Sequence, residues 1–209
     1  MKRKIPCFCE NTFEAEIPEE INLDNEPGYL DEILNGNFLA FRCPNCGKKH
    51  KPEFPLSVHW PSKKLSFEIL PELDRGVLYR RKKRASRKGP NTLETIIGYA
   101  EMAERLAVLR DGYEPVAVEA IKYFLHLKAE EQYPEKEMEI LYYKTERASE
   151  QNFLEFHIHG IKENEVAVMK IPFSLYEKTI DDYKKHPKSE IYSSLRVQTY
   201  LSVKNTMRN

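Results

Sequence analysis

The chain has 209 residues, of which 41% are hydrophobic, so it can bury a core as one large domain or as two smaller ones. Its 33 basic and 33 acidic side chains cancel, which excludes a polyanion-binding protein that is basic throughout. The charge is uneven, however, with a net charge of −3 over residues 1–79, +7 over residues 80–90 and −4 over residues 91–209. We therefore expect two folded regions, 1–79 and 91–209, joined by a basic connector.

The N-terminal stretch MKRKIPCFCENTFEAEIPEE begins with basic side chains but contains no apolar run of signal-peptide length. No segment approaches the roughly 18 consecutive apolar residues of a membrane-spanning helix. We therefore expect a cytoplasmic protein. In a reducing cytoplasm disulfides do not persist, and paired cysteines are more often metal ligands or catalytic thiols.

All the cysteines lie in two short motifs, CFC and CPNC, which contain Cys7, Cys9, Cys43 and Cys46. The spacing of the second motif lets one tight turn present both sulfurs to the same ion, and Gly47 permits the backbone conformation that such a turn tends to require. Four thiolates are a common donor set for structural zinc. The sequence therefore predicts one structural Zn²⁺ ion with all four cysteines as ligands.

The CPNC motif also fits a dithiol redox site, in which the first cysteine is activated at a helix N-terminus. The residues that follow, GKKHKP, are a poor helix start and predict a turn into a strand, so the zinc interpretation is favoured. We interpret His50 as a surface histidine, although it is a conceivable substitute ligand. Four thiolates close the coordination shell, so we do not expect catalysis by this metal.

The segments around the cysteines predict strands that lead into both turns. The sequence TFEAEI, residues 12–17, alternates apolar and acidic side chains, as a half-buried strand does. A short helix is predicted over residues 26–34, ending at Asn35 and Gly36. The sequence NFLAFRC then predicts a strand that delivers Cys43. This arrangement is typical of a zinc ribbon, a small antiparallel sheet.

The two cysteine motifs are followed by a predicted strand pair, PEFPLSVHW and KKLSFEILPE, and by the segment LRDGYEPVAVEAIKYFL. Together these features resemble the bacterial CpXC-domain family, whose motif cysteines correspond to Cys7, Cys9, Cys43 and Cys46. The resemblance covers the N-terminal region and the segment around Asp111, whereas the tail after about residue 140 matches only in general plan. It implies a zinc-binding fold, and because the family is uncharacterised it implies no reaction or partner.

The basic connector is not part of the family pattern. Its side chains could neutralise several phosphates of a nucleic acid, without reading the base sequence, or they could contact an acidic protein surface. A solvated linker that binds nothing has the same composition. The candidate contact residues are Arg80, Arg81, Lys82, Lys83, Arg84, Arg87 and Lys88.

The remaining residues predict an α+β region. A helix is expected over 91–107, with Asn91 as its cap and Glu94 three residues later, and a second helix should run from Pro115 to Pro134. Asp111 and Gly112 should separate the two helices. Three antiparallel strands are predicted at 138–146, 152–160 and 165–171. A capping box of Ser174 and Glu177 predicts a helix over 175–185, and we expect another helix over 193–207.

Glu155, His157 and His159 should share one face of the strand at 152–160, where they could form a metal or acid–base site. The opposite face, with Leu154, Phe156 and Ile158, is what an ordinary amphipathic strand has, and we favour that interpretation.

Enzyme signatures such as GxGxxG, the Walker loop, GxSxG and HExxH are absent from the sequence. We therefore interpret the chain as a non-catalytic, zinc-stabilised binding module whose partner is a protein or a nucleic acid. The alternative is an enzyme with its site around Glu155, His157 and His159.

Overall fold

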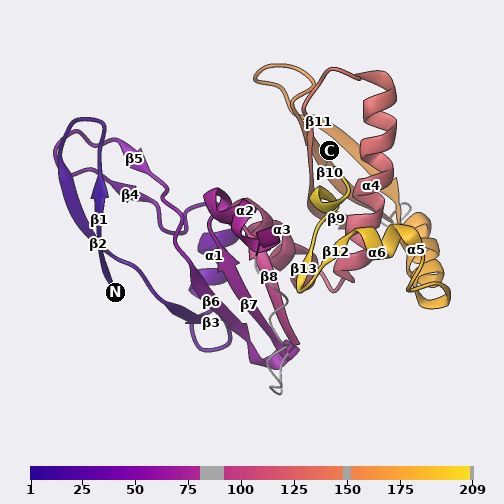
Figure 1. Cartoon of the computed structure of the whole chain (residues 1–209), viewed down its shortest axis with the longest axis horizontal. Helices are drawn as coiled ribbons and strands as arrows, with labels where there is room; N and C mark the ends of the chain where they lie inside the picture. Colours follow the sequence, from indigo (N-terminus) through magenta and orange to yellow (C-terminus); the bar gives the residue numbers. More distant parts are fainter. Residues whose placement is uncertain (81–91, 148–151, 208–209) are drawn as a thin grey trace. The chain divides into compact units, whose positions relative to one another are not determined.

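The computed structural model describes residues 1–80, 92–147 and 152–207 (Figure 1). The protein has a mixed α+β fold with several small sheets, which confirms the predicted fold class. It forms two compact units, Met1–Ala103 and Glu104–Asn209. The division falls within helix α3 (Tyr99–Arg110), later in the chain than the predicted boundary at residue 91. No helix in the described ranges is long and apolar enough to cross a membrane.

The first unit begins with two antiparallel hairpins that carry the cysteines. Strands β1 (Lys2–Pro6) and β2 (Thr12–Glu16) flank the turn that contains the CFC motif. Strands β4 (Phe41–Arg42) and β5 (Lys49–His50) flank the turn that contains the CPNC motif. The predicted strand at 12–17 is therefore confirmed, and the strand that delivers Cys43 is present but only two residues long.

Strands β8, β7, β6 and β3 lie side by side in that order and form the core of the first unit (Figure 1). Their bounds are Glu20–Asn22 for β3, Leu56–Trp60 for β6, Leu65–Leu70 for β7 and Thr92–Ile97 for β8. The predicted strand pair β6–β7 is antiparallel, whereas β3 pairs with β6 and β7 pairs with β8 in parallel. The side chains of Ile21, Val58, Phe67, Ile69 and Ile97 are each at most 1% exposed.

The helices of the first unit are short. Helix α1 (Gly28–Leu34) confirms the predicted helix. The chain leaves the helix through Asn35 and turns at Gly36, whose φ is 63°. Helix α2 (Arg75–Arg80) follows a single 3-10 turn.

The predicted helix over 91–107 is wrong in its first half. Residues 92–97 form strand β8, and α3 begins only at Tyr99. The apolar spacing of Ile96 and Ile97 suits a helix, but both side chains are buried where β8 pairs with β7, at 2% and 0% exposure. Parallel strands buried on both faces have continuous apolar runs, and β-branched residues suit them. Gly98, at a φ of 82°, makes the turn from strand to helix.

The second unit contains a helix, a sheet and C-terminal helices. Helix α4 (Pro115–Gln132) starts at Pro115 as predicted, after the chain turns at Gly112. The three predicted strands are β9 (Glu139–Arg147), β10 (Asn152–His159) and β11 (Ala167–Pro172), antiparallel in the order β11-β10-β9. Helices α4 and α5 (Phe173–Lys185) pack against this sheet (Figure 1).

Two predictions in the C-terminal segment are wrong. The helix predicted over 175–185 is present as α5, but Ser174 is not its cap, because α5 already begins at Phe173 and its N-cap is Pro172. The predicted helix over 193–207 is instead the end of α6 (Glu190–Ser194), the short strand pair β12 (Arg196–Val197) and β13 (Tyr200–Leu201), and a 3-10 turn. Asn205 holds this hairpin, because its Nδ2 donates to the carbonyl oxygens of Leu195 and Tyr200.

A buried network of charged side chains lies between α3 and α4 in the second unit. Lys122 Nζ is 2.7 Å from Glu104 Oε2 and 3.3 Å from Glu119 Oε1. Arg105 donates to the carbonyl oxygen of Leu201, and Glu119 accepts from the backbone N–H of Val203. These bonds tie the C-terminal segment to the helices. Burial, opposed by the Lys122 charge, raises the pKa of Glu104 to about 7.

His126 gives this part of the fold a pH dependence. Burial, followed by the nearby Lys122 charge, lowers the pKa of His126 from its ordinary value of 6.5 to about 4. Between about pH 6.5 and pH 4, His126 is therefore neutral in the folded chain and protonated in the unfolded chain. Stability that depends on His126 is fully present above that pH and is lost as the pH falls toward 4.

We predict that His126 accounts for about 2 kcal/mol of the free energy of unfolding that is lost between about pH 7.5 and pH 5. Urea unfolding at both pH values, on the wild type and on His126→Gln, measures this contribution. The loss should be smaller in the variant and unchanged in His186→Gln, which replaces an exposed histidine. An equal loss in His126→Gln and the wild type would contradict the prediction.

Candidate metal centre

The first cysteine turn is closed by backbone hydrogen bonds. The N–H of Cys7 donates to the carbonyl of Asn11 at 2.8 Å, and the N–H of Glu10 donates to the carbonyl of Cys7 at 3.0 Å. Glu10 adopts a φ of 65°, which lets the chain reverse within this short turn. The turn therefore presents the side chains of Cys7 and Cys9 on the same side.

The second turn has a similar construction. The N–H of Gly47 donates to the carbonyl of Cys43 at 2.9 Å, and the N–H of Cys43 donates to the carbonyl of Lys48 at 3.0 Å. Gly47 has a φ of 71°, so the predicted need for glycine at this position is confirmed.

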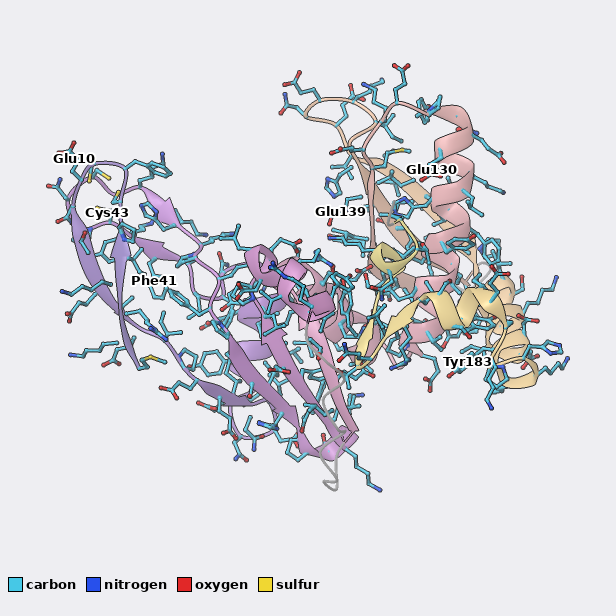
Figure 2. The ribbon with its side chains drawn as sticks, in the orientation of Figure 1. Glu10, Phe41, Cys43, Glu130, Glu139 and Tyr183 are labelled. Atoms are coloured by element: carbon cyan, nitrogen blue, oxygen red, sulfur yellow. The ribbon has the colours of Figure 1, made fainter. Side chains whose placement is uncertain are left out.

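The two turns bring the four sulfur atoms together. Cys7 Sγ lies 3.5 Å from Cys46 Sγ, Cys9 Sγ lies 3.7 Å from Cys43 Sγ, and all four atoms lie within 4.8 Å of one another. Cys43 is buried, and the yellow sulfurs around its label mark the group in Figure 2. In the described part of the chain, this is the group of Cys, His, Asp and Glu side chains that could hold a metal ion.

The spacing of the sulfurs fits a tetrahedral ion. A zinc ion with Zn–S bonds of about 2.3 Å requires sulfur atoms about 3.8 Å apart. A disulfide requires about 2.05 Å, far shorter than either measured separation, and all four cysteines are free. The four cysteines could therefore ligate one metal ion.

The pKa values of two of the thiols are shifted in opposite directions. Burial opposes ionisation of Cys43, but hydrogen bonds from the Cys46 backbone, the Asn11 amide and the Asn45 backbone lower its pKa to about 6. For Cys7, the hydrogen bond from the Cys9 backbone acts downward, but burial and the neighbouring thiols raise the pKa to about 12. Without a cation the sulfurs cannot all ionise at neutral pH, whereas a bound metal ion stabilises all four thiolates together.

Three polar side chains contact the sulfurs, and the sequence analysis missed their roles. Asn11 Nδ2 lies 3.7 Å from Cys43 Sγ, Asn45 Nδ2 lies 3.6 Å from Cys9 Sγ, and His50 Nε2 lies 3.1 Å from Cys7 Sγ. The interpretation of His50 as a surface histidine is wrong, because its ring packs within the site. Its only signal in the sequence is its position at the base of the second hairpin.

An aromatic residue is exposed beside the four-cysteine group. Phe8 lies between two of the cysteines with 85% of its surface exposed. Its ring stacks on His50 at a centroid distance of 6.1 Å, and Lys48 Nζ lies 4.3 Å from the ring centroid. These are the ring's contacts with neighbouring side chains, and the lysine contact is a cation–π interaction.

The other predicted site residues lie elsewhere. Arg80 is exposed at the end of α2, where its Nε donates to the carbonyl of Gly76. The remaining basic candidates, Arg81, Lys82, Lys83, Arg84, Arg87 and Lys88, lie outside the described residues.

Glu155 and His157 do come together on β10. Glu155 Oε1 lies 3.0 Å from His157 Nε2, and Glu155 is 8% exposed. His159 is exposed at the end of the strand. The predicted opposite face is confirmed, because Leu154, Phe156 and Ile158 are at most 4% exposed.

A protein-family model described as "CpXC protein" matches residues 5–122 of the chain. An "Uncharacterized protein" of Treponema pallidum (strain Nichols) is 29% identical over 214 residues, which cover 97% of this chain and 97% of that protein. No solved structure matches the chain significantly. The family match contains all four cysteines and ends within α4, before the β11-β10-β9 sheet begins.

We predict that Cys43→Ser abolishes stoichiometric metal binding, because it removes one of four donors. Asn11→Ala should weaken metal affinity by about 10- to 100-fold, since it removes only a hydrogen bond to a ligand sulfur. Competition with a chromogenic chelator measures both effects. Asn25→Ala, at an exposed asparagine of the same unit, should bind the metal as the wild type does. Undiminished metal binding by Cys43→Ser would refute the four-cysteine assignment.

Proposed function

The chain belongs to the CpXC protein family, and we propose that it is a non-catalytic binding module built around one structural zinc ion. Its partner is a protein or a nucleic acid. The observation that carries this proposal is the group of four sulfurs within 4.8 Å. In this proposal the two cysteine hairpins and the zinc ion form a zinc ribbon. The chain is then arranged as a ribbon region 1–79, a basic connector 80–90 and an α+β region 91–209.

Zinc is favoured over other metals by the donor set. Soft thiolate ligands select zinc, copper(I) and iron–sulfur clusters, and four thiolates in a tetrahedron are the usual structural zinc site. The two sulfur separations of 3.5 and 3.7 Å suit one small ion at the centre of the group. The ligands are Cys7, Cys9, Cys43 and Cys46.

A structural role follows from the coordination. Four cysteines fill a tetrahedral shell, so no position remains for an activated water or a substrate. The short hairpins have little core of their own, so the free energy of zinc binding contributes directly to their folding. Four reduced thiols of this kind also suit the cytoplasm, which is our proposed location.

The partner surface that we propose includes the tip of the zinc ribbon. Phe8 and Lys48 project there, and each is held by contacts within the turn region. The basic connector, from Arg80 to Lys88, would add electrostatic attraction for an anionic partner.

A second candidate function is an enzyme around Glu155, His157 and His159. One observation favours it: the carboxylate of Glu155 holds the His157 ring, as a carboxylate orients a histidine in acid–base sites. The same pair also occurs as an ordinary hydrogen bond on a sheet face.

The decisive experiment is the zinc content of the purified full-length protein, measured by elemental mass spectrometry. We predict about one zinc per chain in the wild type and in a His157→Ala/His159→Ala variant, because four ligands fix one ion. Two metal ions in the wild type that fall to one in the histidine variant would support the enzyme. Less than half an equivalent of zinc in the wild type would refute the structural zinc.

The identity of the partner can be tested through salt dependence. If nucleic acid is bound through the connector, its affinity should fall steeply with salt, with a log–log slope of about −0.9 for each neutralised phosphate of a duplex. Changing Arg80, Arg81, Lys82, Lys83 and Arg84 to glutamine should flatten that slope. Fluorescence anisotropy with a labelled duplex measures it. A slope near zero in the wild type would favour a protein partner.

A further inference from the structure

The first unit contains a mostly apolar cavity of about 290 Å³. Its walls include Ile33 from α1, Phe38 from the segment after α1, and Met102 from α3, each at most 5% exposed. An apolar cavity of about 150 Å³ can hold a benzene ring. This cavity therefore has room for a hydrocarbon side chain of that size together with a small polar group.

The cavity walls are held by hydrogen bonds and ring contacts. The hydroxyl of Tyr99, which also lines the cavity, accepts from the N–H of Phe54 at 2.9 Å and donates to the carbonyl oxygen of the same residue at 3.0 Å. The ring of Phe38 lies 5.3 Å from that of Tyr99 and 5.9 Å from that of Tyr29, measured between centroids. A cavity whose walls are already ordered loses little entropy when a ligand enters.

Two side chains of opposite charge, Lys51 and Glu53, line the same cavity. Lys51 Nζ lies beside Gly36, 3.6 Å from the position that a Cβ atom would take there. Among the described residues, Lys51 forms no ion pair and no hydrogen bond, so it is not paired with Glu53. Asp31 and Glu32 on α1 are exposed and do not line the cavity. The ammonium group of Lys51 is therefore available to an anionic group of a ligand.

The carboxylate of Glu53 is fixed by the backbone. Its Oε1 accepts from the N–H of Tyr99 at 2.7 Å, and its Oε2 accepts from the N–H of Glu72 at 2.6 Å. A carboxylate oxygen can accept two hydrogen bonds, so each oxygen can accept one more. The neighbouring acids Glu72 and Glu101 both pair with Arg75. Among the described residues, Glu53 is therefore the carboxylate that a cationic group of a ligand in the cavity would meet.

We propose that this cavity binds a free α-amino acid with an apolar side chain. The carboxylate of the ligand contacts Lys51, and its ammonium group contacts Glu53. The hydrocarbon side chain lies against Ile33, Phe38 and Met102. Each part of the ligand then meets protein groups of matching chemistry, as in other small-molecule sites that combine an apolar lining with a few polar groups.

The charges distinguish an amino acid from other small ligands. An uncharged hydrocarbon would leave Lys51 and Glu53 without a partner, and an apolar acid would bring a second carboxylate near that of Glu53, where like charges repel. An apolar amine would meet the ammonium group of Lys51 in the same way. A zwitterion, with one charge of each sign, gives both side chains a partner.

The site is independent of the proposed zinc ion, because the described residues that line the cavity do not include a cysteine. It lies within the residues that the family model matches. The second cysteine hairpin begins and ends next to it, since Phe38 precedes β4 and Lys51 directly follows β5. Amino-acid binding and zinc content can therefore be measured separately in the same protein.

Ligand-observed saturation-transfer NMR on the full-length protein tests the proposal with L-leucine, L-leucinamide and N-acetyl-L-leucine. The amide lacks the carboxylate and the acetyl derivative lacks the ammonium group, so both should bind the wild type more weakly than L-leucine does. Lys51→Gln should weaken binding of L-leucine by about 5- to 20-fold, because it removes a charged hydrogen-bond donor at a partly exposed site. The same variant should bind L-leucinamide as the wild type does, since that ligand has no carboxylate for Lys51.

A second variant tests the cavity itself. Ala100→Leu should abolish binding of all three ligands, because Ala100 is an exposed residue of α3 that lines the cavity and a larger side chain there would fill it. Undiminished binding by Ala100→Leu would overturn the assignment of the ligand to this cavity.

Lys4→Gln is the matched control, because it replaces an exposed lysine on β1 of the same unit. It should bind L-leucine as the wild type does, and every variant should keep the zinc content of the wild type. No binding of L-leucine by the wild type would overturn the proposal, as would equal affinity of Lys51→Gln and the wild type for it. Tighter binding of N-acetyl-L-leucine than of L-leucine would overturn the amino-acid assignment in favour of an apolar acid.

The same samples separate failure of this proposal from failure of the zinc proposal. About one zinc per chain without amino-acid binding would refute the amino-acid site alone. Amino-acid binding by protein with less than half an equivalent of zinc would refute the zinc ribbon alone.

Discussion

The close approach of four sulfurs is the constraint on which the N-terminal hairpins depend. At separations of 3.5 to 3.7 Å the thiols share hydrogen bonds unequally. The Cys9 backbone acts to lower the pKa of Cys7, but burial and the neighbouring thiols raise it, whereas burial acts to raise the pKa of Cys43, but hydrogen bonds from the backbone and from Asn11 lower it. A cation at the centre of the group would stabilise all four sulfurs as thiolates. Strands β4 and β5 have only two residues each, and so short a hairpin is not stable by itself. On the proposed zinc assignment, the metal joins two hairpins that could not otherwise hold each other.

In the second unit, buried charged side chains are neutralised by one another. Lys122 and Arg105 face Glu104 and Glu119, so two cations are balanced by two carboxylates. Backbone groups of Tyr142, Leu201 and Val203 complete the hydrogen bonding. Buried ion pairs add little net stability, but leaving one member unpaired is costly. The network therefore favours the single arrangement of the C-terminal segment in which every charge has a partner.

The sequence was most informative where a feature depends on neighbouring residues. The cysteine turns and the glycine of the second turn both follow from local spacing. Features that depend on distant segments could not be predicted. Strand β8 exists because Ile96 and Ile97 pair with β7, and its apolar spacing alone fits a helix equally well. The C-terminal hairpin likewise depends on hydrogen bonds from Asn205 that no local pattern specifies.

The same distinction applies to the candidate site. Cysteine is informative because few roles suit four of them in two pairs, so the grouping of the four cysteines could be predicted from the sequence. Asn11, Asn45 and His50 are common residue types, and only the folded turns show that their nitrogens lie 3.1 to 3.7 Å from cysteine sulfurs. Their hydrogen bonds matter because donors to a thiolate reduce its charge and fix its direction.

On the proposed zinc assignment, a closed shell of four thiolates limits what the ion could contribute to function. Since such an ion has no free coordination position, its effect on a partner must pass through the side chains that it fixes in space. Phe8 is the clearest case, because it lies between Cys7 and Cys9 and yet is 85% exposed. In the second unit, Tyr143 stacks on His157, which forms a hydrogen bond with Glu155. Contacts of this kind restrict the motion of an exposed ring, and such restriction lowers the entropy lost when a partner binds.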